Sequence, residues 1–202
     1  AAWNTLVLAV VSTIVATILG TILAIGIDRF PWGRKANTFL DLVLHIPVVI
    51  PDIILAAALV VAFGLLRFTS SVFETGLFNM IIGHITFQIS FVALVVRSRL
   101  VSIGRDVEEA ARDQCASTPY WLRRVTLPLL LPGIVAGAML AFVISLDDVV
   151  ITEFVKSSGQ ETLPTYMLGQ LRRIITPEIN AISTVLVSLS IFVVGLFFVV
   201  DK

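Results

Sequence analysis

Residues 3–27 read WNTLVLAVVSTIVATILGTILAIGI, a run of 25 positions without an aspartate, glutamate, lysine or arginine. A helix needs about 20 mainly apolar residues to cross the roughly 30 Å of hydrocarbon in a bilayer. This run is long enough and apolar enough to do so. It therefore predicts a membrane-spanning helix, and it sets the class of the fold.

Four further runs along the chain have the same character. Three of them contain 22 residues without a charged side chain, and a fourth of 25 residues is interrupted only by Asp52. Five such runs are too many for the buried helices of a large soluble protein. The chain is therefore predicted to be an all-α integral membrane protein whose residues 1–202 form a single membrane domain. The predicted spans are 3–27, 42–66, 75–96, 125–146 and 179–200.

The composition excludes several other classes of protein. Of the 202 residues, 57% are hydrophobic and 14% are charged, whereas soluble domains average about 25% charged residues. The 14 basic residues are balanced by 14 acidic ones, and the chain has one cysteine. A balanced charge argues against a nucleic-acid partner, since nucleic-acid-binding proteins carry an excess of basic residues. A single cysteine excludes a disulfide scaffold.

The basic residues orient the chain in the membrane. Ten of the 14 lie in the connections 28–41 and 97–124 or at Lys202, and the other four lie in 67–74 and 147–178. Because cytoplasmic connections carry the excess of lysine and arginine, the first group is predicted to be cytoplasmic. Five spans then place the N-terminus outside. The chain starts Ala-Ala-Trp-Asn without features of a signal peptide, so we expect a preceding segment that carries another span.

Proline and glycine shape two of the predicted spans. Pro47 and Pro51 lie one turn apart in the span 42–66, where each removes a backbone donor and bends the helix. In lipid the freed carbonyls need partners, so the bend should face protein or a water-filled cavity. In the fourth span, Gly133, Gly137 and Ala141 recur every four residues and predict the close approach of another helix.

Polar residues near membrane depth are candidates to line a solute pathway. Asp147 and Asp148 end the fourth span, and two interpretations stay open for them. In one, the helix ends at the headgroups with one aspartate solvated and the other paired to an arginine. In the other, the carboxylates attract a cationic solute. The candidate pathway residues are Asp52, His84, Gln88, Asp147, Asp148 and Glu153.

The histidines do not predict a metal site. His45, His84 and Cys115 fall on three different segments, and no pair of them has the spacing of metal ligands. His84 and Gln88 are four residues apart and share one helix face. They are interpreted as interhelical hydrogen-bonding residues or as lining of the pathway.

The cytoplasmic connection 97–124 reads RSRLVSIGRDVEEAARDQCASTPYWLRR, which is too elaborate for a linker. Residues 105–114 predict a short helix with acids in its first turn. Pro119 then permits a second short helix over 120–125, at an angle to the first. An apolar stripe on the first helix predicts contact with the bilayer or with a partner's groove. Its residues are Leu100, Val107, Ala110 and Ala111.

Within this connection, EAA at 109–111, AS at 116–117 and RVTLPL at 124–129 resemble the EAA loop of permease subunits of binding-protein-dependent ABC importers. The resemblance implies the transmembrane fold of a type I ABC importer, whose coupling helix docks on a cytosolic ATPase. The family has a glycine where Cys115 stands, which places the geometry of the following turn in question. The implied coupling residues are Glu108, Glu109, Ala110, Ala111, Arg112, Asp113, Cys115 and Ala116.

Other motifs are similar to the spermidine/putrescine-type branch of the family, in particular to its C-type permease. They include PDI at 51–53, GHITF at 83–87, SLDDVV at 145–150, TLP at 162–164 and TPEINA at 176–181. The resemblance implies a multi-pass protein of the bacterial inner membrane, surrounded by lipid. Its implied partners are two ATPases, a second and different permease, and a periplasmic binding protein. A polyamine is the implied solute, with an opine, aminoethylphosphonate or an amino-acid-like solute as alternatives.

The chain lacks a Gly-x-x-x-x-Gly-Lys-Ser/Thr loop, so we expect a non-catalytic subunit that binds no cofactor, with ATP and magnesium held by the ATPases. Alternating access driven by the ATPases is the expected mechanism. An ion-driven secondary transporter is the alternative from another class, but it needs acids near mid-membrane, where Asp52 is the one candidate. An intramembrane hydrolase would need His84 with Ser90 or Ser98, and the sequence has no nucleophile elbow to support it.

Overall fold

A computed structural model describes residues 1–171, 180–181, 183–185, 187–189, 191–192 and 195. All its regular elements in this part of the chain are helices, which confirms the all-α prediction. Half of the predicted span 179–200 falls outside the described residues.

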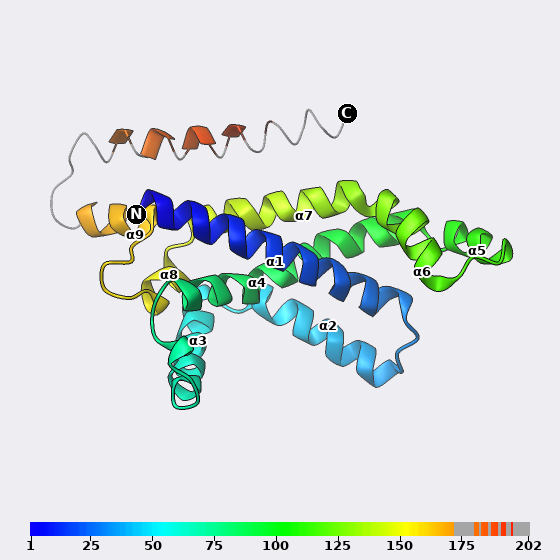
Figure 1. Cartoon of the computed structure of the whole chain (residues 1–202), viewed down its shortest axis with the longest axis horizontal. Helices are drawn as coiled ribbons and strands as arrows, with labels where there is room; N and C mark the ends of the chain where they lie inside the picture. Colours follow the sequence, from blue (N-terminus) through cyan, green and yellow to red (C-terminus); the bar gives the residue numbers. More distant parts are fainter. Residues whose placement is uncertain (172–179, 182, 186, 190, 193–194, 196–202) are drawn as a thin grey trace.

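Three long helices run side by side and form the body of the molecule (Figure 1). They are α1 (Ala2–Arg29), α4 (Leu77–Ile103) and α7 (Leu127–Asp147), and each is long and apolar enough to cross a membrane. They correspond to the predicted spans 3–27, 75–96 and 125–146, with starts within two residues of those predicted. Helix α4 continues past 96, so the first seven residues of the predicted connection 97–124 are helical.

The predicted span 42–66 is two helices. Helix α2 (Arg34–Val49) and helix α3 (Asp52–Arg67) meet at an angle of 110°. Ile50 is extended, with φ −70° and ψ 135°, because a residue that precedes proline avoids the helical region. The predicted bend is confirmed, and it is sharp enough to divide the span into two helices. Helix α3 turns away from the three long helices (Figure 1).

The second half of the connection also differs from the prediction. Helix α5 (Asp106–Asp113) is followed by α6 (Thr118–Trp121), which continues through a π-helical turn (Leu122–Thr126) into α7. Residues Thr118–Asp147 thus form one continuous helix of 30 residues. Residues 120–125 are helical as predicted, but they belong to this long helix and do not form a separate short one. Pro119 lies in the first turn of the helix, where its missing N–H interrupts no hydrogen bond.

The connections predicted to lie outside the cell gather at the opposite end of the bundle from α5 (Figure 1), and the two ends are called outer and inner after that prediction. They contain a 3₁₀ turn (Ser71–Phe73), α8 (Val150–Val155) and α9 (Leu163–Leu171). Three hydrogen bonds tie the starts of α1 and α4 to the segment before α9. Asn4 Nδ2 donates to Glu161 O at 3.2 Å, Leu163 N donates to Thr5 Oγ1 at 2.8 Å, and Leu77 N donates to Gln160 Oε1 at 2.7 Å. The connections therefore alternate between two ends, as the charge pattern predicts.

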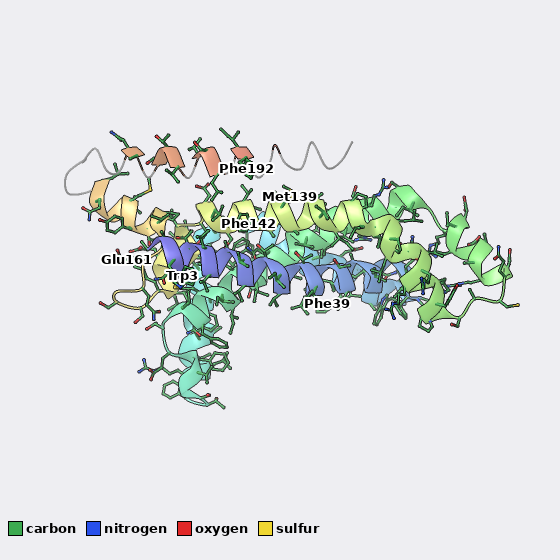
Figure 2. The ribbon with its side chains drawn as sticks, turned by 45° about the horizontal axis from the view of Figure 1, so that its top comes forward. Trp3, Phe39, Met139, Phe142, Glu161 and Phe192 are labelled. Atoms are coloured by element: carbon green, nitrogen blue, oxygen red, sulfur yellow. The ribbon has the colours of Figure 1, made fainter. Side chains whose placement is uncertain are left out.

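Tryptophans mark the two ends of α1. Trp3, at the outer end, is 75% exposed (Figure 2), and Trp32 follows the inner end with its indole N–H donating to Gly26 O at 2.7 Å. Between them, Ile14, Ile18 and Ile22 form an exposed stripe at four-residue spacing. Apolar side chains flanked by tryptophans at both ends are typical of a helix in a membrane.

Small residues bring α1 and α7 close to α4 at Val92, which is fully buried. A Cβ atom added to Gly20 would lie 2.8 Å from Val92 Cβ, and one added to Gly137 would lie 3.3 Å from Val92 Cγ1. A Cβ atom on Gly133 would lie 2.7 Å from Arg99 Cβ. The prediction that Gly133 and Gly137 permit close helix packing is confirmed, and Gly20 plays the same part on α1.

Replacing Gly20 with alanine should destabilise the bundle by about 1–3 kcal/mol, as overpacking of a dense core does. The new methyl group would lie 2.8 Å from Val92 Cβ and 2.9 Å from the backbone oxygen of Ile89. Gly26→Ala on the same helix is the matched control, because no described atom outside its own helix lies within 4 Å of its added Cβ. The melting temperature of the purified protein in detergent should fall for Gly20→Ala alone. Equal melting temperatures for the two variants would contradict this packing.

Candidate functional site

Helix α5 lies at the inner end of the bundle, and most of its side chains are exposed. The acids of its first turn and Arg112 in its last turn complement the helix dipole. Among the predicted coupling residues, Glu109, Ala110, Arg112, Asp113 and Cys115 are exposed, while Ala111 and Ala116 are half-buried. Leu100, which was predicted to share the apolar stripe, is fully buried because it belongs to α4.

Glu108 is the predicted coupling residue that faces inward, and it is 4% exposed. Its Oε1 accepts hydrogen bonds from Arg29 Nε at 2.9 Å and from Thr126 Oγ1 at 2.9 Å. Successive residues on a helix point about 100° apart, so Glu108 and Glu109 cannot share a face. The sequence motif contains both glutamates. The fold distinguishes them, because Arg29 lies on the side of α5 that Glu108 faces.

Cys115 ends α5 in a left-handed conformation, with φ +59°, and no other non-glycine residue in the described part of the chain has a positive φ. Its N–H donates to Arg112 O at 2.8 Å, and Ala116 N donates to Ala111 O at 3.1 Å. Glycine is usual at this position after a helix, because a side chain costs roughly 1–2 kcal/mol there. Cys115 therefore adopts the left-handed turn conformation that the family's glycine would provide at this position. Arg112 lies 5.1 Å from the ring centre of Trp121 and links α5 to α6.

A pocket of about 330 Å³ lies at the outer end, between α3, α4, α7 and α8. This volume falls within the range of about 300–1,000 Å³ that is typical of small-molecule sites. Three predicted pathway residues line it together with two aromatic rings. These lining residues are Asp52, Asp147, Asp148, Phe87 and Phe91.

Asp148 uses its carboxylate to hold α8. The oxygens accept hydrogen bonds from Ile151 N at 3.3 Å, from Thr152 N at 2.9 Å and from Thr152 Oγ1 at 2.9 Å. Oδ2 also lies 3.2 Å from His84 Nε2. One aspartate of the pair was predicted to bind an arginine in one interpretation, and its partner is instead a histidine. The sequence carried no signal for this pairing, since His84 lies on another helix.

Asp52 and Asp147 are exposed, and neither has a hydrogen-bond or ion-pair partner among the described residues. Phe87 and Phe91 meet edge to face, with ring centres 6.4 Å apart. Free carboxylates beside aromatic rings favour a cation over an anion. Asp147 also lines a larger, apolar groove of about 520 Å³ against α9, where it is the one charged residue among the described lining residues.

The other predicted pathway residues do not line this pocket. His84 and Gln88 are fully buried within the bundle. Gln88 Nε2 donates to Ala141 O at 2.9 Å, which is the interhelical bond that its spacing predicted. Glu153 pairs with Lys156 at 2.8 Å on the surface.

His84 also bridges Asp148 to Ser145, in the order of a hydrolase triad. Its Nδ1 lies 2.8 Å from Ser145 Oγ, which in turn lies 3.4 Å from Ser12 Oγ. His84 is 0% exposed and Ser145 is 3% exposed. A nucleophile needs room for a substrate carbonyl beside it. These bonds therefore connect α1, α4, α7 and α8. They do not support the hydrolase alternative, which paired His84 with Ser90 or Ser98.

Curated relatives share this chain's sequence over most of its length. PotC, the spermidine/putrescine transport system permease protein of Escherichia coli K12, is 35% identical over 194 residues, covering 96% of this chain and 71% of PotC. PotI, the putrescine transport system permease protein of the same strain, is 36% identical over 166 residues, covering 82% and 59%. PhnV of Salmonella paratyphi A, a putative 2-aminoethylphosphonate transport system permease protein, is 28% identical over 162 residues, covering 79% and 59%.

Solved structures share the fold at lower sequence identity. A chain of the MetNI methionine ABC transporter in an inward-facing conformation superposes with a TM-score of 0.79 at 21% identity, over 98% of this chain and 91% of that one. A chain of a bacterial ABC transporter that imports alginate gives a TM-score of 0.78 at 20% identity, over 100% and 79%.

The family model for the inner membrane component of binding-protein-dependent transport systems matches residues 6–201. The matched residues include helix α5 and the residues that line the carboxylate pocket. The chain therefore belongs to this family of inner membrane transport components and has the transmembrane fold of ABC importer permeases.

Proposed function

We propose that this chain is the permease subunit of an ATP-driven importer in the bacterial inner membrane, and that it forms half of the pathway for a polyamine. Family membership and the likeness to PotC and PotI support the class of transporter. The observation that carries the solute class is the outer pocket, in which Asp52 and Asp147 have no cationic partner among the described residues.

A polyamine matches this pocket by charge. Carboxylates near membrane depth are costly unless a cation pairs with them. A diamine such as putrescine offers one ammonium group to each free carboxylate, and Phe87 and Phe91 offer ring faces to the chain's charged ends. Aminoethylphosphonate, an opine or an amino-acid-like solute brings an anionic group, which the same carboxylates repel.

The exposed side of α5 is the proposed docking surface for a cytosolic ATPase. Val107, Glu109, Ala110, Arg112 and Asp113 lie on it. Two such ATPases hold ATP and magnesium, a second and different permease completes the pathway, and a periplasmic binding protein delivers the solute at the outer end. Helix α5 and helix α8, which borders the carboxylate pocket, lie at opposite ends of the bundle (Figure 1), as this division requires.

The proposed mechanism is alternating access. Closure of the ATPases displaces α5, and the helices joined to it rock as rigid bodies, so that the outer pocket accepts the solute. The ion-driven alternative rested on Asp52 near mid-membrane. Asp52 starts α3 and lines the outer pocket beside Asp147, so we assign it to solute binding and not to a coupling ion.

Neutralising the pocket should weaken uptake of a cation selectively. We expect Asp52→Asn and Asp147→Asn each to raise the apparent KM for putrescine about five- to tenfold, the worth of one partly solvated ion pair. The KM for aminoethylphosphonate, if it is transported, should not rise. Uptake by proteoliposomes measures both. Glu74→Gln is the control, because Glu74 is an acid on the same side of the membrane in an exposed pair with Arg67. An unchanged KM for putrescine in both variants would show that the pocket is not part of the solute pathway.

Reversing the charge at Glu109 should weaken the docking of the ATPase on α5. Glu109→Lys places a cation on the exposed face of α5. An ATPase surface that is complementary to the glutamate would then meet a like charge, which strongly disfavours binding. Import should therefore fall at least about tenfold. Import is compared at equal amounts of permease in the membrane. Glu74→Lys, the same reversal at the other end, should keep its import. Normal import by Glu109→Lys would remove Glu109 from the docking surface.

A further inference from the structure

Arg29 joins the inner ends of several helices through one buried guanidinium. It is the last residue of α1, and it pairs with Glu108 and with Asp28. Its Nη2 also donates to two carbonyl oxygens at the end of α4, those of Leu100 at 3.3 Å and Gly104 at 3.1 Å. The side chains of Arg29 and Glu108 are each 5% exposed. Arg29 therefore satisfies carbonyls that the helix end leaves unpaired, and Glu108 balances its charge.

Glu108 gives α5 a contact with α1 that the chain itself does not provide. Along the sequence, α5 is connected only to α4, through Gly104 and Arg105, and to the helix that contains α6 and α7. Glu108 adds a bond to α1 through Arg29 and a bond to the start of α7 through Thr126, whose Oγ1 donates to it at 2.9 Å. Arg105 supports the same junction, since its Nη2 donates to Asp28 O at 2.7 Å.

We propose that Glu108 is a positioning residue that transmits the displacement of α5 to α1, α4 and α7 together. This inference rests on the proposed function, in which an ATPase displaces α5. Glu109 meets the partner on the outer side of the helix, and Glu108 holds the inner side to the bundle. A buried ion pair adds little net stability over apolar side chains, but its directional bonds fix orientation. With these bonds, α5 moves as one rigid body with the inner ends of the helices that it contacts.

The test is the ratio of solute imported to ATP hydrolysed, in proteoliposomes that contain the complete transporter. Glu108→Ala removes the acceptor, whereas Glu108→Gln keeps an oxygen at the same place. We expect the ratio to fall about tenfold for Glu108→Ala, a coupling effect of ordinary size, and to recover at least in part for Glu108→Gln. Glu74→Ala is the matched control, because it breaks an exposed pair between a glutamate and an arginine and should leave the ratio unchanged.

A second readout follows the structure directly. Amide hydrogen exchange over residues 106–113 should be faster in Glu108→Ala than in the wild type, in the nucleotide-free complex, because α5 loses its bonds to Arg29 and Thr126. If Glu108→Ala does not assemble, Thr126→Val removes a single hydrogen bond. It should lower the ratio about twofold, in line with the modest worth of one such bond.

The outcomes separate the two proposals. If the wild-type complex imports with ATP but Glu108→Ala keeps the wild-type ratio, the role of Glu108 is overturned. The same holds if import falls only in proportion to the amount of assembled complex. If the wild type shows no ATP-driven import, the proposed function fails instead. Unchanged amide exchange in Glu108→Ala would overturn the inference even then.

Discussion

The contact of α1 and α7 with α4 at Val92 is the constraint on which the rest of the structure depends. Gly20 leaves no room for a methyl group beside Val92, and a Cβ atom on Gly137 would lie tightly, 3.3 Å from Val92 Cγ1, so small residues let the three helices pack closely. Lipid tails are as apolar as leucine, and they offer no hydrophobic reason for helices to associate. Close van der Waals packing must hold the bundle together. With α4 held between its neighbours, its inner end positions α5 and its outer half positions His84 beneath α8.

Each end of the bundle uses a pair of adjacent acids in the same way. Glu108 is bonded inward to Arg29, while its neighbour Glu109 is exposed. Asp148 is bonded inward to α8 and His84, while its neighbour Asp147 is exposed in the pocket. Buried polar groups in a membrane protein must find partners within the protein. One acid of each pair therefore maintains the fold, and the other remains available to a partner or a solute.

Local sequence features predicted the elements better than the contacts between them. Uncharged runs located α1, α4 and α7, and the prolines located the bend before α3. The 110° angle and the continuous helix from α6 into α7 depend on packing that no local pattern records. The sequence could not say which acid of each pair faces inward, because Arg29 and His84 are distant along the chain. The family's glycine at the position of Cys115 was a usable signal, and the backbone there does have a positive φ.

The central claim is that this chain provides a pathway through which ATP hydrolysis by a partner drives a cationic solute. Uptake of radiolabelled putrescine by proteoliposomes that contain the complete transporter and its binding protein tests this claim most directly. The assay compares ATP supplied on the side of α5 with an imposed ion gradient in the absence of ATP. We predict uptake that requires ATP and that excess spermidine suppresses. Uptake that persists on the ion gradient without ATP would contradict the claim.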